Sequence, residues 1–317
     1  MNQYFISSVG ERAAKGQPLS AQAHYAIGIE LTSGHIRMLA VDLLVRRLGA
    51  KTVAIPFQAN EEYALSMARA IENFIDEEGL SRQRLLGVGV TVPGIVDADR
   101  THITDAPTIQ VKRMAAADLI CHIPYPVWME NDANAGGYAE WWNRAGVADM
   151  AYLSVGRGVG GAILIAGSTY LGTHTRSGEF GHMCIHPGGR TCECGQRGCL
   201  EAYCSTGRLS DALGISLEEF FSGVEGGNAQ YRELWDDYLD NLAIGVRNIH
   251  VILDCGIVVG GKLSQFLARH FAEMESRLRT LDAGYVREPY LSICRYRSHS
   301  TEIGAALYFI DKFIKQH

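Results

Sequence analysis

The sequence predicts a duplicated α/β fold, because a strand hairpin opens each half of the chain. The first hairpin begins at Tyr25, where two apolar runs flank a short turn that contains Gly34. The second occupies residues 151–165, where two apolar runs flank a glycine-rich turn. The chain of 317 residues is about twice as long as a typical domain, which fits two coupled lobes.

The first half is expected to run as three strands, a helix and a fourth strand. The strand-like runs are YAIGIEL, IRMLAVDL and TVAIPF, the last at 52–57. Apolar residues recur at helical spacing from 64 to 75, with Asn60 as the N-cap and Gly79 as the stop. The continuous apolar run at 85–92 is typical of a strand buried on both faces. Residues 124–129 then predict a short strand that leads into ENDANAGGYAEWW.

The second half is expected to continue after its hairpin with a long helix over 231–250 and a buried strand in GIVVGG. A short amphipathic helix around 302–314 closes the chain. We expect residues 1–21 to be a tail or linker, 22–130 an N-terminal lobe and 131–301 a C-terminal lobe. The final segment, 302–317, can pack back on the N-terminal lobe.

Composition restricts the classes of function. The chain is 47% apolar and 20% charged, which is typical of a globular protein, and its net charge of −6 argues against a general nucleic-acid surface. No apolar run reaches about 18 residues, and residues 1–20 lack the apolar core of a signal peptide. We therefore expect a cytoplasmic protein without a membrane span.

A cluster of cysteines predicts a metal site. Five of the 8 cysteines fall between residues 184 and 204, and a chain without an export signal favours metal binding over disulfides. The expected ligands of one structural, tetrahedral zinc ion are His182, Cys192, Cys194 and Cys199. His186 is the substitute if His182 is not a ligand. Cys184 and Cys204 are expected to pack as small apolar residues.

The segments GEFGHM, RTCECGQRGCLEAYCS and ENDANAGGYAE resemble the ROK family of bacterial repressors, open reading frames and sugar kinases. The resemblance runs from about residue 24 to the end of the chain. It implies an actin-like, hexokinase-like fold, a duplicated ribonuclease-H-like arrangement of two lobes with a sugar in a central cleft. It also makes a homodimer the expected assembly.

The resemblance also implies a set of sugar-binding residues. Asp132 matches the family's general base, Asn131 can hold a neighbouring hydroxyl, and the alternative role of Asp132 is that of a helix N-cap. Three further matches lie near the cysteines, and His182 would bind zinc through one ring nitrogen and sugar through the other. The whole expected set is Gly94, Asn131, Asp132, Glu179, His182 and Glu201.

The nucleotide-binding residues depart from the kinase pattern. Family kinases carry Asp-x-Gly-Gly-Thr in the first hairpin, and this chain has Glu30-Leu31-Thr32-Ser33-Gly34. We expect Thr32 and Ser33 to be unfavourable where the backbone needs a positive φ or a close approach to phosphate. Arg157 replaces a small hydroxyl residue in the second phosphate loop, where it can bind phosphate or block the pocket. The remaining glycine turns are equally explained by the fold, and the candidate nucleotide set is Glu30, Gly34, Gly156, Gly158, Gly160, Gly260 and Gly261.

Two functions stay open at this point. The first is a regulator-type sensor similar to sugar-responsive repressors of N-acetylglucosamine or xylose, which binds a hexose or amino-hexose without phosphoryl transfer. The roughly 20 residues before the first strand are too few for a helix-turn-helix domain, so direct DNA binding is not expected of this chain, which is either truncated or a stand-alone sensor. The second is an ATP- and Mg²⁺-dependent hexose kinase with Asp132 as general base. A zinc enzyme is disfavoured because four protein ligands leave no open position on the metal.

Overall fold

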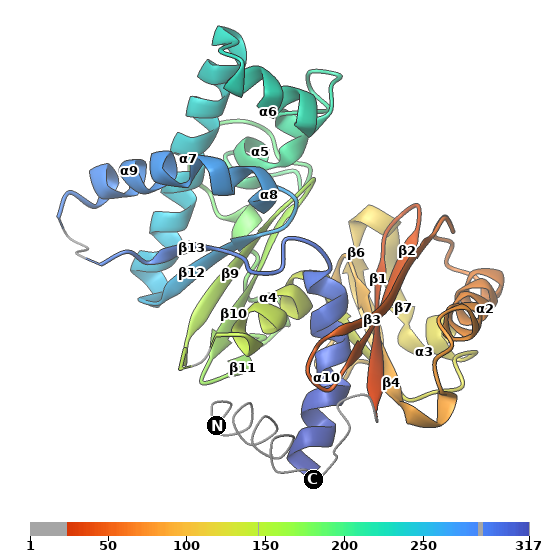
Figure 1. Cartoon of the computed structure of the whole chain (residues 1–317). Coiled ribbons are helices and arrows are strands. Elements are labelled where there is room, and N and C mark those ends of the chain that lie inside the picture. Colours follow the sequence, from red (N-terminus) through yellow and green to blue (C-terminus); the bar gives the residue numbers. More distant parts are fainter. Residues whose placement is uncertain (1–23, 145, 285–287, 317) are drawn as a thin grey trace. The chain divides into compact units, whose positions relative to one another are not determined.

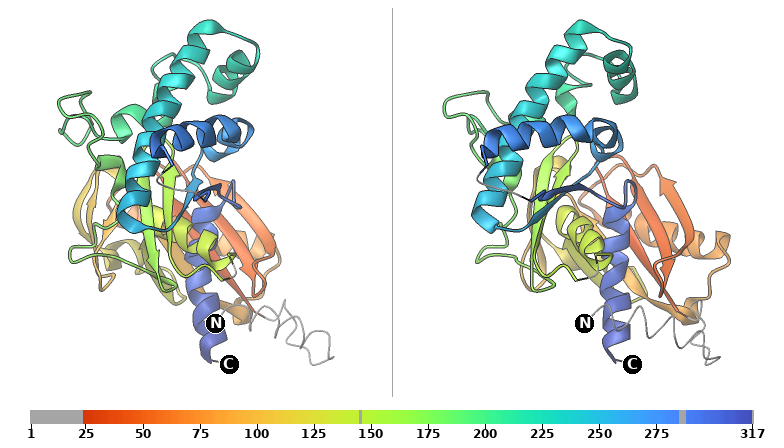
Figure 2. Two further views of the ribbon diagram at one scale, coloured as in Figure 1. Left: turned by 90° about the vertical axis from the view of Figure 1, so that its left-hand side faces the viewer. Right: turned by 60° about the vertical axis from the view of Figure 1, so that its left-hand side comes forward.

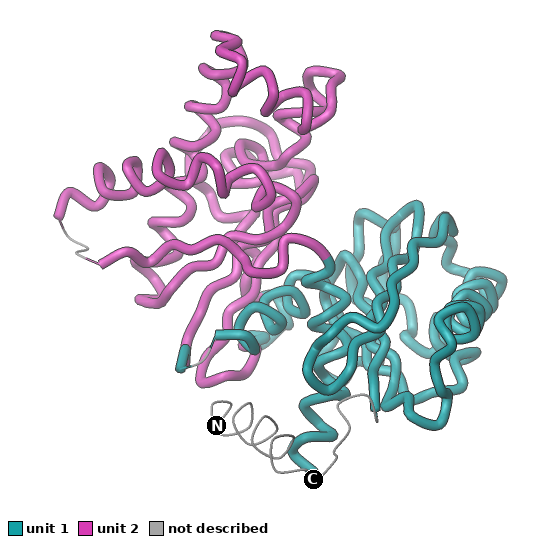
Figure 3. Tube along the Cα trace, in the orientation of Figure 1, with its two compact units in different colours: residues 1–147, 171–176, 299–317 teal, residues 148–170, 177–298 magenta. Residues whose placement is uncertain are grey.

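A computed structural model describes residues 24–144, 146–284 and 288–316, and the chain divides into two compact units (Figure 3). Unit 1 comprises residues 1–147, 171–176 and 299–317, and unit 2 comprises 148–170 and 177–298. The tail expected over 1–21 lies outside the described residues. The domain boundaries expected from the sequence stay a prediction, because compact units need not coincide with segments that fold independently.

Unit 1 is built on a five-stranded sheet with the order β3-β2-β1-β4-β8 and a small three-stranded sheet, β5-β6-β7 (Figure 1). Its elements are β1 (Tyr25–Leu31), β2 (Ile36–Asp42), β3 (Arg47–Val53), α2 (Glu61–Glu77), β4 (Leu85–Val92), β5 (Ile95–Val96), β6 (His102–Ala106), β7 (Val111–Ala115), α3 (Ala116–Ile120), β8 (Val127–Asn131), α4 (Asp132–Trp142) and α10 (Ser300–Gln316).

The two faces of this sheet are covered by different means. Alternating residues such as Ile27 and Val90 share one buried cluster with the apolar face of α2. On the opposite face, α10 packs so closely that a Cβ on Gly28 would lie 1.7 Å from the carbonyl oxygen of Glu302. Glycine in β1 and β4 is therefore required for the approach of α10, which explains why the last helix belongs to unit 1.

Unit 2 repeats the arrangement with the strand order β11-β10-β9-β12-β13. In both sheets the first hairpin is antiparallel, and the later strands join in parallel beside its first strand. The elements are β9 (Met150–Val155), β10 (Val159–Ile165), β11 (Ser168–Thr169), α5 (Glu201–Cys204), α6 (Leu217–Glu225), α7 (Ala229–Leu253), β12 (Gly256–Gly260), α8 (Ser264–Leu267), α9 (Phe271–Asp282) and β13 (Leu291–Ile293). The internal duplication expected from the two hairpins is present in this strand order.

The long helix α7 carries much of the core of unit 2. Figure 2 shows α7 crossing the second sheet with α9 beside it. Trp235, Tyr238 and Leu242 are fully buried on the inner side of α7. Its N-cap is Asn228, whose side chain accepts a hydrogen bond from the backbone of Tyr231, so the helix begins two residues before the predicted start.

The third strand was expected at 52–57, and this placement is wrong. β3 begins at Arg47 because the Asp42 carboxylate accepts hydrogen bonds from the backbone of Leu44 and Arg46, which folds the chain back at once. β3 is an edge strand in which only Gly49 is fully buried and the other residues are partly or fully exposed, so it lacks the apolar run that marks a buried strand. The small sheet β5-β6-β7 has no counterpart in the expected elements.

Within the described ranges, no helix combines the length and the apolar character that crossing a membrane would require.

Candidate functional site

Four side chains of unit 2 bring metal-binding atoms together. His182, Cys192, Cys194 and Cys199 each offer one such atom, and these atoms lie within 4.8 Å of one another. His182 Nδ1 is 3.9 Å from Cys192 Sγ, and the Sγ atoms of Cys194 and Cys199 are 3.8 Å apart. A tetrahedral zinc ion with Zn–S bonds of about 2.3 Å requires sulfur atoms about 3.8 Å apart. The arrangement therefore fits a single closed metal site.

The loop that carries these ligands folds through two glycine turns. The backbone of Cys192 donates to Gln196 O and Gly195 donates back to Cys192 O, with Gly195 at a φ of 87°. Gly198 has a φ of 86°, and a Cβ there would lie 1.9 Å from His186 O. Only glycine fits these two positions, so the spacing of the cysteines and the glycines between them form one structural unit.

The electrostatics of the thiols also favour a cation. Burial raises the pKa of Cys192 to about 12, and burial also raises the pKa of Cys199. The pKa of Cys194 is lowered, chiefly by a hydrogen bond from the backbone of Gln196. Burial thus favours the neutral thiols of Cys192 and Cys199, and a divalent ion would be needed to hold them as thiolates.

The other candidate ligands have different surroundings. His186 Nε2 donates to Asn241 Oδ1 at 2.6 Å, so its ring is directed to α7 and away from the cluster. Cys204 is fully buried, as expected for a small apolar side chain. Cys184 is exposed, so the expectation that it would pack in the core is wrong. Its neighbours Met183 and Ile185 pack against the core, and alternation along this extended segment directs Cys184 to the opposite side.

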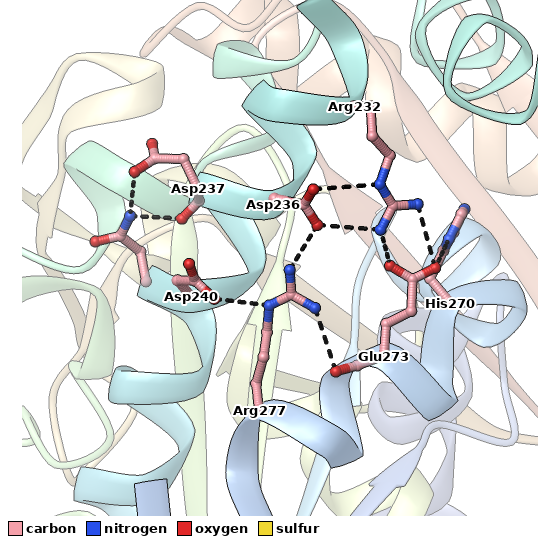
Figure 4. A network of polar contacts seen from close by, with 8 residues as sticks. Arg232, Asp236, Asp237, Asp240, His270, Glu273 and Arg277 are labelled. Carbon is pink, nitrogen blue, oxygen red and sulfur yellow. Dashed lines mark hydrogen bonds and ion pairs between the residues drawn. The ribbon is translucent and has the colours of Figure 1, made fainter. Parts of the chain in front are cut away.

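Helix α7 holds the metal loop through two side-chain contacts. Asn241, which receives the hydrogen bond from His186, donates to the backbone oxygen of Asp237 at 2.6 Å, and Arg190 of the loop lies 3.7 Å from the Asp237 carboxylate. Ion pairs that join α7 to α9 fix the helix in turn (Figure 4). Arg277 lies 2.6 Å from Asp236 and 2.7 Å from Asp240. The loop is therefore held by a rigid element.

Three of the expected sugar-binding residues lie beside the metal cluster. His182 Nδ1 faces Cys192, and its Nε2 lies 3.8 Å from Glu179 Oε2. Glu201 Oε1 is 3.6 Å from Cys192 Sγ, and Glu201 Oε2 accepts a hydrogen bond of 2.8 Å from the backbone of Val159. The cluster, which includes His182, and the carboxylates of Glu179 and Glu201 thus form one polar site on unit 2. A bound metal would fix the ring of His182 in this site.

The other expected sugar-binding residues lie together on unit 1, where β8 ends and α4 begins. Asn131 is the N-cap of α4, because its Oδ1 accepts from the backbone of Asn134 at 2.9 Å. The alternative role weighed for Asp132, that of the N-cap, therefore belongs to its neighbour. Asp132 Oδ1 instead accepts from the backbone of Ala133 and from the Asn131 amide, at 2.8 and 3.2 Å.

Gly94 supports Asn131 from the preceding loop. The Asn131 amide donates to Gly94 O at 2.9 Å, and a Cβ on Gly94 would lie 2.4 Å from Asp105 O and from the Ala106 methyl group. A larger residue at position 94 would displace the Gly94 carbonyl and with it the Asn131 amide that this carbonyl orients.

A brace that the sequence did not predict orients the same segment. Arg100 donates to Glu130 Oε2 at 2.7 Å, and its guanidinium lies over the ring of Trp128. The other oxygen of Glu130 accepts from the backbone of Asn131 at 2.9 Å and from the Asn134 amide at 3.2 Å. Thirty residues separate this arginine from its carboxylate, so no local pattern marks the pair.

The first hairpin of unit 1 differs from the expectation in its backbone. The residues at 32–34, all described by the structure, have no positive φ, so the expected strain at Thr32 and Ser33 is wrong. The Thr32 hydroxyl closes the turn instead. It accepts from the backbone of His35 at 3.0 Å and of Gly34 at 3.4 Å, and it donates to His35 O at 2.8 Å. Two amides of this turn are thus bonded within the chain.

Glu30, the residue that stands where family kinases have aspartate, is held by an arginine. It forms an ion pair with Arg37, its partner across β1 and β2, and Arg37 Nε also lies 3.2 Å from the fully buried Glu302. Burial, together with the nearby carboxylates of Glu302 and Asp132, raises the pKa of Glu30 to about 7 despite the opposing effect of Arg37. The cationic partner of this carboxylate is therefore a side chain of the protein itself.

The glycine turns of unit 2 are explained largely by packing. A Cβ on Gly260 would lie 2.1 Å from Tyr152 Oη, and Gly261, with a φ of 72°, lies against the backbone of Val155. Arg157 donates to Asp211 at 3.0 Å through Nε, so its charge is already paired. The remaining candidates for nucleotide binding lie in the β9–β10 turn and at the start of β10: Gly156, Gly158 and Gly160.

Comparison with known proteins identifies the family. The ROK family model matches residues 26–312. The chain is 29% identical to a putative xylose repressor of Caldicellulosiruptor sp. over 80% of its own length and 69% of that protein. It is 33% identical to a glucokinase of Halalkalibacterium halodurans over 63% of its length and 68% of that protein. The xylose repressor of Bacillus subtilis and the regulator NagC of Escherichia coli are matched over 58% and 52% of their own length.

The structural comparison agrees. A ROK hexokinase from Thermus thermophilus aligns with a TM-score of 0.75 and 27% identity, covering 92% of this chain and all of that one. The chain belongs to the ROK family, and its fold is the actin-like, ribonuclease-H-like fold of ROK hexokinases and repressors.

Proposed function

We propose that this chain is a regulator-type sugar sensor that binds a hexose or amino-hexose and does not transfer phosphate. The observation that carries the proposal is the β1–β2 hairpin. Its turn amides bond to the Thr32 hydroxyl, and the Glu30 carboxylate pairs with Arg37. Phosphoryl transfer depends on free backbone donors and on a carboxylate available to a metal-bound phosphate, so this hairpin is poorly suited to it.

Two sets of side chains support sugar binding. Asn131 and Asp132 on unit 1, with the Gly94 backbone beside them, offer an amide and a carboxylate. Glu179, His182 and Glu201 on unit 2 offer two carboxylates and an imidazole nitrogen. Carboxylates accept hydrogen bonds from sugar hydroxyls, and amides both donate and accept, so these groups suit a polyhydroxylated ligand.

Zinc is the metal that the four-residue cluster suits best, because three soft sulfur ligands and one imidazole lie within 4.8 Å of one another, and zinc binds such a set tetrahedrally. Its role would be structural, because His182, Cys192, Cys194 and Cys199 fill all four positions. A bound zinc ion would fix the ring of His182, and α7 holds the loop through the hydrogen bond between Asn241 and His186.

The second candidate is an ATP-dependent hexose kinase. It is favoured by Asp132, whose carboxylate lies at the start of α4 and could accept a proton from a sugar hydroxyl, and by the likeness to a ROK hexokinase and a glucokinase. Binding a hydroxyl group would require the same carboxylate, so Asp132 by itself does not separate the two functions. A homodimer, on symmetry grounds, is part of both proposals.

Calorimetric titration with glucose, N-acetylglucosamine, N-acetylmannosamine and xylose tests the sugar proposal. We expect saturable binding of at least one sugar. Asp132→Asn and Glu179→Gln should each weaken it by about tenfold or more, because each removes a charged acceptor. The double variant measures whether the two units serve one ligand, since a coupled effect is expected only if both carboxylates contact the same sugar.

Glu62→Gln on the exposed side of α2 is the matched control and should leave the affinity unchanged. Binding that is equally strong in the wild type and in both site variants would contradict the proposed residues. Failure of glucose, N-acetylglucosamine and N-acetylmannosamine to bind would contradict the hexose class, and binding of xylose alone would indicate a pentose ligand instead.

A further inference from the structure

A fifth cysteine lies directly beside the metal cluster. Cys184 is exposed and is not one of the four clustered ligands, yet it forms an antiparallel bridge with Cys199, which is. The backbone of Ile185 donates to Gly198 O at 2.8 Å, and the backbone of Leu200 donates to Met183 O at 2.8 Å. These bonds flank the cysteine pair on both sides, so Cys184 and Cys199 form a non-hydrogen-bonded cross-strand pair.

This type of pair has the geometry that a disulfide needs. The Cα atoms of directly opposed residues in a non-hydrogen-bonded pair are about 4.5 Å apart, and their side chains leave the same face. A disulfide requires Cα atoms about 4.4 to 6.8 Å apart. The Sγ atom of Cys184 lies 3.7 Å from Arg197 O and 3.1 Å from the place where a Cβ on Gly198 would be, so it is beside the residues that precede Cys199.

We propose that Cys184 and Cys199 form a reversible disulfide under peroxide, and that this disulfide opens the metal site. The Cys184 thiolate attacks hydrogen peroxide, so an S–O bond forms, the O–O bond breaks and hydroxide leaves. The Cys199 thiolate then attacks the sulfenic sulfur, forming the S–S bond and expelling a second hydroxide. The two sulfurs lose two electrons to the peroxide, and each hydroxide takes up one proton to leave as water.

The consequence follows from the ligand set. Once the Cys199 sulfur is in a disulfide it can no longer serve as a thiolate ligand, so the metal keeps only His182, Cys192 and Cys194. The segments that carry Glu179 and Glu201, on either side of the metal loop, would then no longer be held in place by a fully coordinated metal ion. The inference rests on the metal centre of the proposed function, whereas the disulfide itself is detected by a measurement that requires neither bound metal nor bound sugar.

Trypsin separates the relevant cysteines, because Arg176, Arg190, Arg197 and Arg208 delimit three peptides. Cys184 lies in 177–190, Cys192 and Cys194 lie in 191–197, and Cys199 lies in 198–208 with Cys204. The whole protein is treated with hydrogen peroxide, free thiols are blocked with N-ethylmaleimide, and the digest is analysed by mass spectrometry. Metal release is followed in parallel with a chromogenic zinc chelator.

We expect a cross-link between 177–190 and 198–208 that fragmentation assigns to Cys199, with zinc release that follows it and reverses on addition of dithiothreitol and zinc. Cys184→Ser should lose the cross-link and retain zinc at peroxide levels that empty the wild type. Cys121→Ser, which removes an exposed thiol on unit 1, should behave as the wild type. Equal zinc content and melting temperature of the reduced variants establish that both are folded.

Two results would overturn the proposal. One is a dominant cross-link between 191–197 and 198–208, since Cys194 and Cys199 are themselves 3.8 Å apart. The other is zinc release from Cys184→Ser at the rate of the wild type. Purified protein that holds no zinc, yet forms the 184–199 cross-link, would contradict the metal centre alone.

Discussion

The β1–β2 and β9–β10 hairpins open sheets of the same topology, but different side chains bond to their backbone amides. In the first hairpin the Thr32 hydroxyl, a group of the turn itself, accepts from two turn amides, and Arg37 pairs with Glu30. The second is bonded to another part of the chain, because the backbone of Val159 donates to Glu201 beside the metal cluster. At Gly158 a Cβ would lie 3.4 Å from the same carboxylate.

This difference shows how one duplicated backbone can serve two purposes. In unit 1 the hairpin uses its polar groups to stabilise itself, which leaves few of them for a phosphate. In unit 2 the hairpin holds a carboxylate of the proposed sugar site in place. The proposed function is therefore asymmetric, with polar groups available at the proposed sugar site and bonded within the protein at the first hairpin.

The largest effect is expected from removing a metal ligand. This change disrupts the metal cluster beside Glu201, the residue to which the second hairpin is bonded. Cys192→Ser should reduce zinc from about one ion per chain to near zero and cost about 3 kcal/mol or more of unfolding free energy, because loop folding is coupled to metal binding. Elemental analysis and chemical denaturation measure both. Cys121→Ser is the control, and full zinc occupancy in Cys192→Ser would refute the ligand set.

The first hairpin is broken most directly at its arginine. Arg37→Met leaves the buried carboxylates of Glu30 and Glu302 without their shared cation, which should cost about 3 kcal/mol of stability. Lys51→Met in the neighbouring strand β3, which removes a partly exposed ion pair with Glu77 at the end of α2, should cost less than about 1 kcal/mol. Equal losses in the two variants, measured by urea unfolding, would show that the Arg37 pair is unimportant.

The free energy of unfolding should depend on pH through Glu30 of the first hairpin. Its pKa is raised from 4.5 to about 7 in the folded protein, so the folded state holds a proton there that the unfolded state has released. The stability contributed by this proton is complete below pH 4.5 and is lost as the pH rises to about 7. Glu30→Gln should flatten the decline between these limits, as followed by denaturation at several pH values. An unchanged slope would place the titrating group elsewhere.

The smallest effect is expected at the turn hydroxyl. Thr32→Val removes the acceptor of two backbone amides and should cost about 1 kcal/mol while leaving sugar affinity unchanged. Denaturation and calorimetry measure the two quantities. A large loss of sugar affinity would mean that the first hairpin contributes to ligand binding as well as to its own stability.

Sequence patterns predicted the features whose causes are local. The two hairpins, the helix capped by Asn60 and the buried strand over 85–92 follow from apolar spacing and turn residues within a few positions. The four clustered metal-binding residues were found because three of them lie within one short glycine-rich loop. The site residues of unit 1 were proposed from the family resemblance.

The remaining features depend on contacts between distant residues. Arg100 and Glu130 are 30 positions apart, and Arg37 meets Glu302 from the other end of the chain, so neither pair leaves a local pattern. The expected backbone strain at Thr32 is absent for a related reason. The turn adopts ordinary backbone angles and uses a side-chain hydroxyl, which the comparison with glycine could not indicate.

A coupled assay for ADP distinguishes a sugar sensor from a sugar kinase. The zinc-loaded protein is incubated with ATP, Mg²⁺ and each sugar that it binds by calorimetry. We expect saturable sugar binding with no ADP formed above the sugar-free background. Sugar-dependent ADP formation that disappears in Asp132→Asn would contradict this expectation and would establish the chain as a kinase.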